Sequence, residues 1–425
     1  MQQLQHWQAT LKEHWGIEAE LNRLDGEYDL NFRAKDPLGE GYILKVMRQG
    51  CEAWLVDMQV KAFEHITAQQ PQLPCPRVIR SSTEKLLLTL ADENGEERLV
   101  WLLNQLPGQC YANVEPKSDA LIHEVGQVLG GSAKALASFQ HHGLARDFKW
   151  NLMRANWVKD EISCITDPAR RKIISLISAE FAKLEPDLAA LPKQAIHNDA
   201  NDYNIMVTGV LNAPRRVSGL IDLGDMCTAP RICDLAIAAA YIVLDHDTPA
   251  AALAALVAGY HAVNPLTPGE VDMVWPLLRT RLAVSVVNST LMAAENPDDP
   301  YVKISQAPAW RFLEDNQIHG GLLNARLRAA CGLPVVEGAD RVNAWLDKER
   351  GNFTPLMGQG IVDAPMGSLS VENSTWPQNP FHMPLNEAAR VGEEFEDQGR
   401  IWLGYYHEPR LIYADPAFRN GPWKA

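Results

Sequence analysis

The stretch that decides the fold begins with AIHNDANDYNIMV, residues 195–207, and continues after a short polar turn with VSGLIDLGD, residues 217–225. Asp199 is followed by Asn204 before the first apolar strand pattern, and the second apolar run leads directly into Asp222. Short apolar runs rich in β-branched residues are typical of buried strands. The pattern predicts two polar loops, each beside a strand, that bring two carboxylates and an amide to one site.

These side chains suit the transfer of a phosphoryl group from ATP to a hydroxyl. That reaction needs a proton acceptor near the hydroxyl and Mg²⁺ to neutralise the charge on the phosphates. Asp199 can accept the proton, while Asn204 and Asp222 can offer hard oxygen ligands to Mg²⁺. Asp and Asn in a polar loop are also common turn residues, but two motifs in this order favour catalysis. His197 is expected to hold the first loop by packing and hydrogen bonding.

Both motifs resemble the catalytic core of the aminoglycoside phosphotransferase and choline kinase family, whose members are small-molecule kinases. HNDANDYNIMV and GLIDLGDMCTAPRICDLAIAAAYIVL are similar to the hydroxylysine kinase-like branch in particular. The resemblance implies an α+β, two-lobed protein-kinase-like fold with a small antiparallel sheet in the first lobe. We expect this lobe over residues 1–106, a helical catalytic and substrate lobe over 107–350, and a linker with a small β-rich segment over 351–425.

The resemblance assigns nucleotide-binding residues to the first lobe. Lys45 lies in the strand pattern GYILKV and matches the family lysine that reaches the ATP phosphates. Gly26 lies in the turn where the family folds a loop over those phosphates. A helix expected over residues 53–69 carries Gln59 where the family has a glutamate that pairs with the lysine. Asp57 and Glu64 are carboxylates nearby on the same helix, so the partner of Lys45 stays open. A glutamine there would orient Lys45 without neutralising it.

The segment LNQLPGQ, residues 103–109, resembles the hinge that offers backbone groups to adenine. Leu103 and Gln105 are therefore expected beside the nucleotide. Because such contacts use the main chain, the identity of these side chains is uninformative.

Two further carboxylates are candidates for binding a cationic substrate. Asp147 lies in RDFKWNL, residues 146–152, which resembles the family segment that leads to the substrate cleft. A helix cap is the equally favoured role for it. Asp225 follows closely after Asp222, and it either adds to the acidic site or binds a substrate amine.

Composition narrows the partners and the compartment. A formal net charge of −14 argues against nucleic acid and anionic membranes, and suits a small cationic substrate that bears a hydroxyl. The seven cysteines are scattered without a C-x-x-C pair, which predicts reduced thiols in the cytoplasm. The N-terminal stretch lacks the basic start and apolar centre of a signal peptide.

The composition and the sequence pattern change near the C-terminal end of the chain. Residues 352–380 are rich in Gly, Pro, Ser and Asn without a helical period, which indicates linker or coil. Residues 400–414 have a strand pattern. This tail resembles the junction in longer bacterial proteins that join such a kinase to a peptidase-like module and an aminotransferase-fold phospholyase. The resemblance implies covalently fused downstream modules, neither of which this sequence contains.

Together these features predict an ATP-dependent kinase for an amino alcohol or a hydroxylated amino acid, with hydroxylysine and ethanolamine as examples. A nucleotide-binding regulatory module without turnover, a pseudokinase, is the alternative. Gln59 and the sparse glycine loop favour the pseudokinase, whereas the intact catalytic motifs favour the enzyme. A protein kinase is disfavoured, because no A-P-E segment follows Asp222 and the helical run from Arg231 leaves no room for an activation loop.

Overall fold

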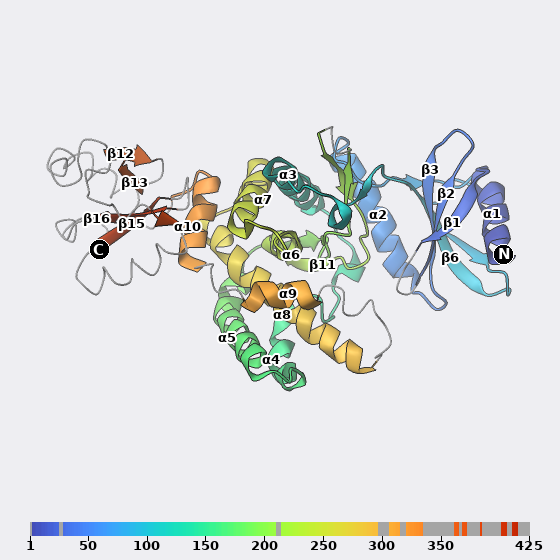
Figure 1. Ribbon diagram of the computed structural model, residues 1–425. Helices are drawn as coiled ribbons and strands as arrows, with labels where there is room; N and C mark the ends of the chain where they lie inside the picture. Colours follow the sequence, from blue (N-terminus) through green and yellow to red (C-terminus); the bar gives the residue numbers. More distant parts are fainter. Residues whose placement is uncertain are drawn as a thin grey trace. The chain divides into compact units, whose positions relative to one another are not determined.

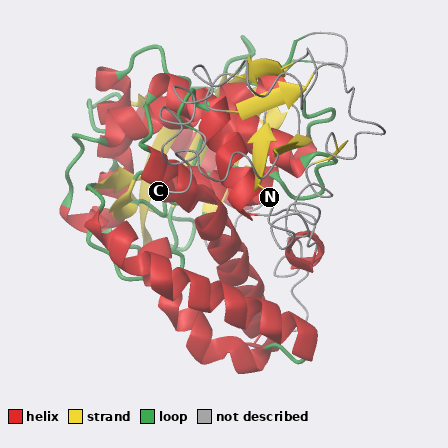
Figure 2. Cartoon of the chain, turned by 90° about the vertical axis from the view of Figure 1, so that its left-hand side faces the viewer, coloured by secondary structure: helices red, strands yellow, loops and turns green. Residues whose placement is uncertain are grey.

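The computed structural model describes residues 2–24, 29–209, 214–295, 306–314 and 320–334, together with five short strands further along the chain. The chain divides into two compact units, one formed by Met1–Ala155 with Glu185–Tyr241 and the other by Asn156–Leu184 with Ile242–Ala425. The predicted lobe boundary near residue 106 lies inside the first unit, so the sheet and both polar loops belong to one unit. Helices and antiparallel strands are both present (Figure 2), which confirms the predicted α+β class.

The first unit begins with an antiparallel six-stranded sheet (Figure 1). Its strand order is β1-β2-β3-β6-β4, and β5 also pairs with β6. The strands are β1 (Glu20–Leu24), β2 (Leu30–Lys35), β3 (Gly41–Val46), β4 (Val78–Ile79), β5 (Leu88–Ala91) and β6 (Glu97–Asn104). In this register Lys45 of β3 lies opposite Asn31 of β2 and Trp101 of β6. The predicted lysine strand is confirmed with the same bounds.

Two helices cover opposite faces of this sheet (Figure 1), α1 (Gln2–Trp15) and α2 (Ala53–Gln69). The buried side chains Trp7 and Leu11 of α1 pack on the face that carries Leu44 and its alternate neighbours. The apolar side of α2 packs on the face that carries Trp101. Because successive strand residues point to opposite faces, Lys45 belongs to the α2 face. The helix bounds predicted for α2 are confirmed.

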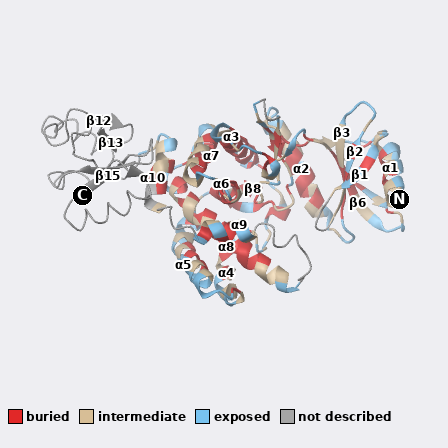
Figure 3. Ribbon diagram, in the orientation of Figure 1, coloured by how far each residue is buried: buried red, intermediate tan, exposed pale blue. Residues whose placement is uncertain are grey.

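A second set of elements in this unit carries the two polar loops. Strand β9 pairs with β10 and β7, and β8 pairs with β11. The elements are β7 (Gln109–Cys110), α3 (Asp119–Leu136), β8 (Lys193–Ile196), β9 (Ile205–Thr208), β10 (Arg216–Leu220), β11 (Cys227–Pro230) and α6 (Ile232–Ile242). The predicted catalytic loop therefore connects β8 to β9, and the predicted metal loop connects β10 to β11. Almost every residue of α6 is buried (Figure 3), and apart from Asp234 the buried residues are apolar.

The second unit is mainly helical. Its helices are α4 (Val158–Glu161), α5 (Pro168–Ala190, which begins here and ends in the first unit), α7 (Pro249–Val263), α8 (Pro268–Glu295), α9 (Gln306–Glu314) and α10 (Gly320–Ala330). The long helix α8 packs against α4, α9 and α10. Among the described residues, no helix combines the length and the apolar character needed to cross a membrane.

Short strands account for the described part of the C-terminal segment. They are β12 (Ile361–Ala364), β13 (Ser368–Val371), β14 (Met383–Pro384), β15 (Ile401–Tyr405) and β16 (Arg410–Ala414). Strand β12 pairs with β13, and β16 pairs with both β14 and β15. The strands that the sequence predicts within residues 400–414 are present.

Candidate active site

Asp199 lies in the loop between β8 and β9 and is held by two amides of the same loop. Asn201 Nδ2 lies 3.1 Å from both carboxylate oxygens of Asp199. Asn204 Nδ2 donates to the Asp199 backbone oxygen at 2.8 Å and to its Oδ2 at 2.9 Å. These bonds fix the carboxylate, and because they use the amide nitrogen of Asn204, its Oδ1 is turned away from Asp199.

His197 joins the two loops from a fully buried position. Its Nδ1 accepts the backbone N–H of Asp199 at 3.2 Å, so the proton sits on Nε2, which donates to the Ile221 backbone oxygen at 2.9 Å. Ile221 in turn donates its N–H to the Asn204 backbone oxygen at 2.9 Å. The structural role that the sequence suggests for His197 is confirmed by these bonds, which tie the Asp199 loop to the residue before Asp222.

Asp234, in the first turn of α6, also holds this loop. Its two carboxylate oxygens accept the backbone N–H groups of His197 at 2.9 Å and Asn198 at 2.6 Å. The residue is 3% exposed, and burial raises the pKa of its carboxyl above the usual value although these bonds oppose the rise. These two bonds make Asp234 an anchor of the Asp199 loop.

The raised pKa of Asp234 predicts a pH-dependent contribution to stability. Between the ordinary carboxyl value and the raised one, the folded protein keeps a proton that the unfolded chain has released. The free energy of unfolding therefore falls as the pH rises through that window. Asp234→Asn cannot titrate, so the wild-type value minus the variant value is expected to decline across the window, as measured by urea unfolding at several pH values. A difference that stays flat or grows with pH would contradict the raised pKa of Asp234.

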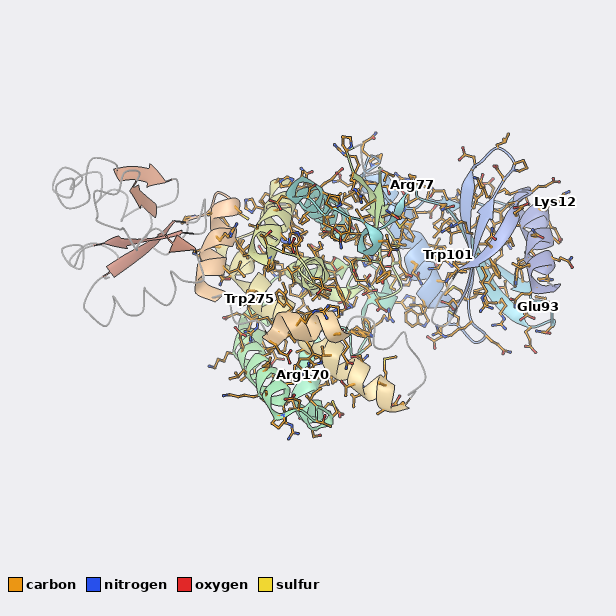
Figure 4. The ribbon with its side chains drawn as sticks, viewed as in Figure 1. Lys12, Arg77, Glu93, Trp101, Arg170 and Trp275 are labelled. Carbon is orange, nitrogen blue, oxygen red and sulfur yellow. The ribbon has the colours of Figure 1, made fainter. Side chains whose placement is uncertain are left out.

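Lys45 of β3 forms an ion pair with Asp222 of the second loop. Lys45 Nζ lies 3.7 Å from Asp222 Oδ2 and 5.4 Å from the centre of the Trp101 ring, labelled in Figure 4. The lysine is 13% exposed, whereas half of the Asp222 side chain is open to solvent. The Lys45 ammonium is the main cause that holds the pKa of Asp222 below its usual value. Lys45 therefore keeps the Asp222 carboxylate ionised, and half of this side chain is exposed to solvent.

Both loops contain a non-glycine residue in the left-handed region of backbone space. Asn198 has φ +66° and Asp222 has φ +65°. Asn and Asp tolerate this region better than other side chains, yet the conformation still costs energy and is typical of functional sites. In the second loop it is stabilised by an Asx turn, because Asp222 Oδ1 accepts the Gly224 N–H at 3.0 Å.

The predicted nucleotide residues in the first unit have mixed surroundings. Gln59 is buried on α2 and its amide nitrogen donates to the Leu55 oxygen of its own helix at 3.3 Å. The contacts that the structure describes for Lys45 are the ion pair with Asp222 and the Trp101 ring, and the Gln59 partnership stays a prediction. Gly26 lies outside the described residues.

The hinge segment is already engaged in backbone bonding. Leu103 pairs with β3 on one side and with β4 on the other. Gln105 donates its N–H to the Gly41 oxygen at 2.8 Å, and its side chain lies against Gly41 so closely that a Cβ there would stand 2.5 Å from the Gln105 amide oxygen. Adenine contacts at Leu103 and Gln105 stay a prediction, which at Gln105 would rely on the carbonyl because the N–H has a partner.

The two substrate candidates occupy different surroundings. Asp147 is 75% exposed and its Oδ1 lies 3.2 Å from Arg154 Nε. Asp225 follows the Asx turn, and its charge contributes to the raised pKa of the buried Cys227 thiol, which is about 12 and has burial as its main cause. Neither placement tests a substrate role, so both assignments stay predictions.

The oxygen atoms offered by Asn204 and Asp222 fit a divalent cation such as Mg²⁺. Asn204 Oδ1 is turned away from Asp199, and the Asp222 carboxylate is ionised and half open. Across the part of the chain that the structure describes, no group of three or more His, Cys, Asp or Glu residues gathers into a metal cage. Two protein ligands suit Mg²⁺, which commonly binds one or two carboxylates and completes its shell with phosphates and water.

Sequence reasoning missed two contacts to this site. Asn201 holds the Asp199 carboxylate, and its position two residues after Asp199 is a signal that local turn chemistry offers. Arg146 donates from Nη1 to the Gly224 backbone oxygen at 2.6 Å across a long sequence separation. No local sequence pattern predicts the contact of Arg146 with Gly224.

Comparison with known proteins places this arrangement in a family. A model described as the phosphotransferase enzyme family (APH) matches residues 20–272. Hydroxylysine kinase of Danio rerio is 25% identical over 324 residues, which cover 73% of this chain and 90% of that protein. Hydroxylysine kinase of Mus musculus is 24% identical over 318 residues, covering 70% and 84% respectively.

Solved structures share the fold at low identity. An amicoumacin kinase in complex with AMP-PNP, Ca²⁺ and Ami has a TM-score of 0.55 at 14% identity, covering 73% of this chain and 93% of that one. A microcompartment-associated aminopropanol kinase has a TM-score of 0.51 at 14% identity, covering 77% and 98%. Because the family model spans more than half of the sequence, the chain belongs to the phosphotransferase enzyme family, and it is a small-molecule kinase with a hydroxyl group as acceptor.

Proposed function

We propose that this protein transfers the γ-phosphoryl group of ATP to the hydroxyl of an amino alcohol or a hydroxylated amino acid, with hydroxylysine as the first candidate. The observation that carries the proposal is a continuous set of contacts in one unit. Asp199 bonds to Asn204, Asn204 bonds to Ile221, and Asp222 follows Ile221 and pairs with Lys45. These contacts support a fixed position of the proton acceptor, Asp199, relative to the side chains that would bind the metal and the phosphates.

Each side chain has a distinct chemical task in this proposal. Asp199 orients the acceptor hydroxyl and takes its proton. Asn204 Oδ1 and Asp222 Oδ2 would hold Mg²⁺, which when bound neutralises charge on the phosphates. Lys45 contributes a second positive charge beside the phosphates. Gly26, Gln59, Leu103 and Gln105 are proposed to line the nucleotide on the side of the sheet.

The choice of acceptor rests on the relatives and on charge. The curated relatives are named hydroxylysine kinase, and one structural neighbour is named aminopropanol kinase. Both names denote a hydroxyl compound that also carries an amine. The acidic balance of this chain suits a cation, and Asp147 and Asp225 are the proposed carboxylates for its ammonium. Asp147 would exchange its Arg154 partner for the substrate. A cytoplasmic location, from the unpaired cysteines, is part of the same proposal.

Release of ADP from MgATP tests the proposal across a panel of acceptors. The panel contains hydroxylysine, ethanolamine, choline, homoserine, threonine and an aminoglycoside. We expect ADP release above the water background with hydroxylysine or another amino alcohol, and no release above that background with the aminoglycoside. If MgATP binds but no acceptor raises ADP release, the regulatory pseudokinase replaces the kinase as the better account.

A further inference from the structure

Arg146 reaches the second loop from the segment that follows α3. Its Nη1 donates to the Gly224 backbone oxygen at 2.6 Å, a short bond for a charged donor. The guanidinium lies over the Phe148 ring, with its central carbon 4.4 Å from the ring centre. The ring supports the plane of the guanidinium by a cation–π contact, so the donor is held in one direction.

Gly224 orients the carboxylate of Asp222. Its N–H donates to Asp222 Oδ1 at 3.0 Å, while the other oxygen, Oδ2, faces Lys45 at 3.7 Å. Arg146 holds the carbonyl of the same glycine. Gly224 therefore has hydrogen-bond partners at both its N–H and its C=O, so a shift of its backbone would also disturb the bond that orients the Asp222 carboxylate.

The same segment contacts the first loop. Asn198 Nδ2 lies 3.5 Å from the Trp150 backbone oxygen, at the limit of a hydrogen bond. Asn198 directly precedes Asp199 and is fully buried. Residues 146–150 thus touch both loops, with the strong contact at Arg146 and the weak one at Trp150.

We propose that Arg146 is a positioning residue for the metal site, which it serves by fixing Gly224 and hence the direction of the Asp222 carboxylate. This inference rests on the proposed role of Asp222 as a metal ligand. Groups that orient a metal ligand typically change metal affinity by about 10- to 100-fold when they are removed. An arginine that merely stabilised the fold would lower the melting temperature without a selective loss of metal binding.

Binding of Mn²⁺ to the whole 425-residue chain with ADP, followed by water-proton relaxation, tests the proposal. Arg146→Ala is expected to weaken Mn²⁺ binding by about 10- to 100-fold, to leave ADP binding without metal unchanged, and to leave the KM for the acceptor unchanged. Arg146→Lys keeps a donor without the rigid fork, so its Mn²⁺ affinity should fall between wild type and alanine.

Arg216→Ala is the control for loss of an arginine elsewhere in the same unit, because Arg216 pairs with Glu124 at 2.9 Å and is 72% exposed. It should bind Mn²⁺ as the wild type does. Wild-type Mn²⁺ affinity in Arg146→Ala would overturn the proposal. If that variant fails to fold, Phe148→Leu decides: weaker Mn²⁺ binding supports the proposal and wild-type binding overturns it. Asp222→Asn is measured alongside, because wild-type Mn²⁺ affinity there would instead remove Asp222 as a ligand and the proposed function with it.

Discussion

Asp199→Asn is expected to lower turnover by about 10²- to 10⁴-fold while ATP still binds, because the variant loses a general base without losing a phosphate contact. Asparagine has nearly the same shape, so Asn201 and Asn204 keep a partner on one side of residue 199. Steady-state ADP release with the best acceptor gives the turnover, and calorimetric titration with MgATP gives the affinity.

Asp202→Asn is the matched control for this variant, because it makes the same substitution in the same loop. Asp202 is partly buried, and burial is the main cause that raises its pKa. Its backbone oxygen, which substitution preserves, accepts the Ala112 N–H at 3.0 Å. Turnover in Asp202→Asn should stay within a few-fold of wild type. Equal losses in the two variants would mean that the loop, and not the Asp199 carboxylate, is sensitive to substitution.

Asp222→Asn is expected to lower turnover by about 10²- to 10³-fold, the range for loss of one preorganised electrostatic contact. It should also remove most of the gain in nucleotide affinity that Mg²⁺ provides. The reason is that the variant loses both the charge that pairs with Lys45 and an anionic metal ligand. Titrating ADP with and without Mg²⁺ measures that gain directly.

Asp245→Asn controls for the backbone conformation of Asp222. Asp245 also has a left-handed φ, +56°, and also forms an ion pair, with Arg311 at 2.8 Å. The pair is exposed, so its loss should have little effect on stability or on nucleotide binding. A Mg²⁺-dependent gain that is unchanged in Asp222→Asn would contradict the assigned role of that residue.

Local patterns in the sequence were sufficient for the elements that carry the site. The spacing of Asp199 and Asn204, and the apolar run before Asp222, predict the two loops because strand burial and turn chemistry act over few residues. The alternation around Lys45 predicts β3 with its observed bounds for the same reason. The helix α2 has the bounds that the sequence analysis expects, Ala53–Gln69.

Contacts between distant segments could not be predicted in this way. Arg146 and Gly224 are 78 positions apart, and Asp234 is 37 positions from His197. The pairing of β8 with β11 likewise depends on how the chain returns after the metal loop. The hinge segment is a second case in which the sequence is not sufficient. The resemblance suggests backbone groups that are available to adenine, but the fold already uses the N–H groups of Asn104 and Gln105 in hydrogen bonds.

The most direct test of the central claim is the identity of the product. Phosphorus NMR of a reaction with MgATP and hydroxylysine distinguishes a phosphate ester from the inorganic phosphate that hydrolysis would give. The account predicts an ester on the hydroxyl oxygen with the wild-type protein and a much slower appearance of that ester with Asp199→Asn. Inorganic phosphate as the only product, or an ester formed equally fast by the variant, would contradict the account.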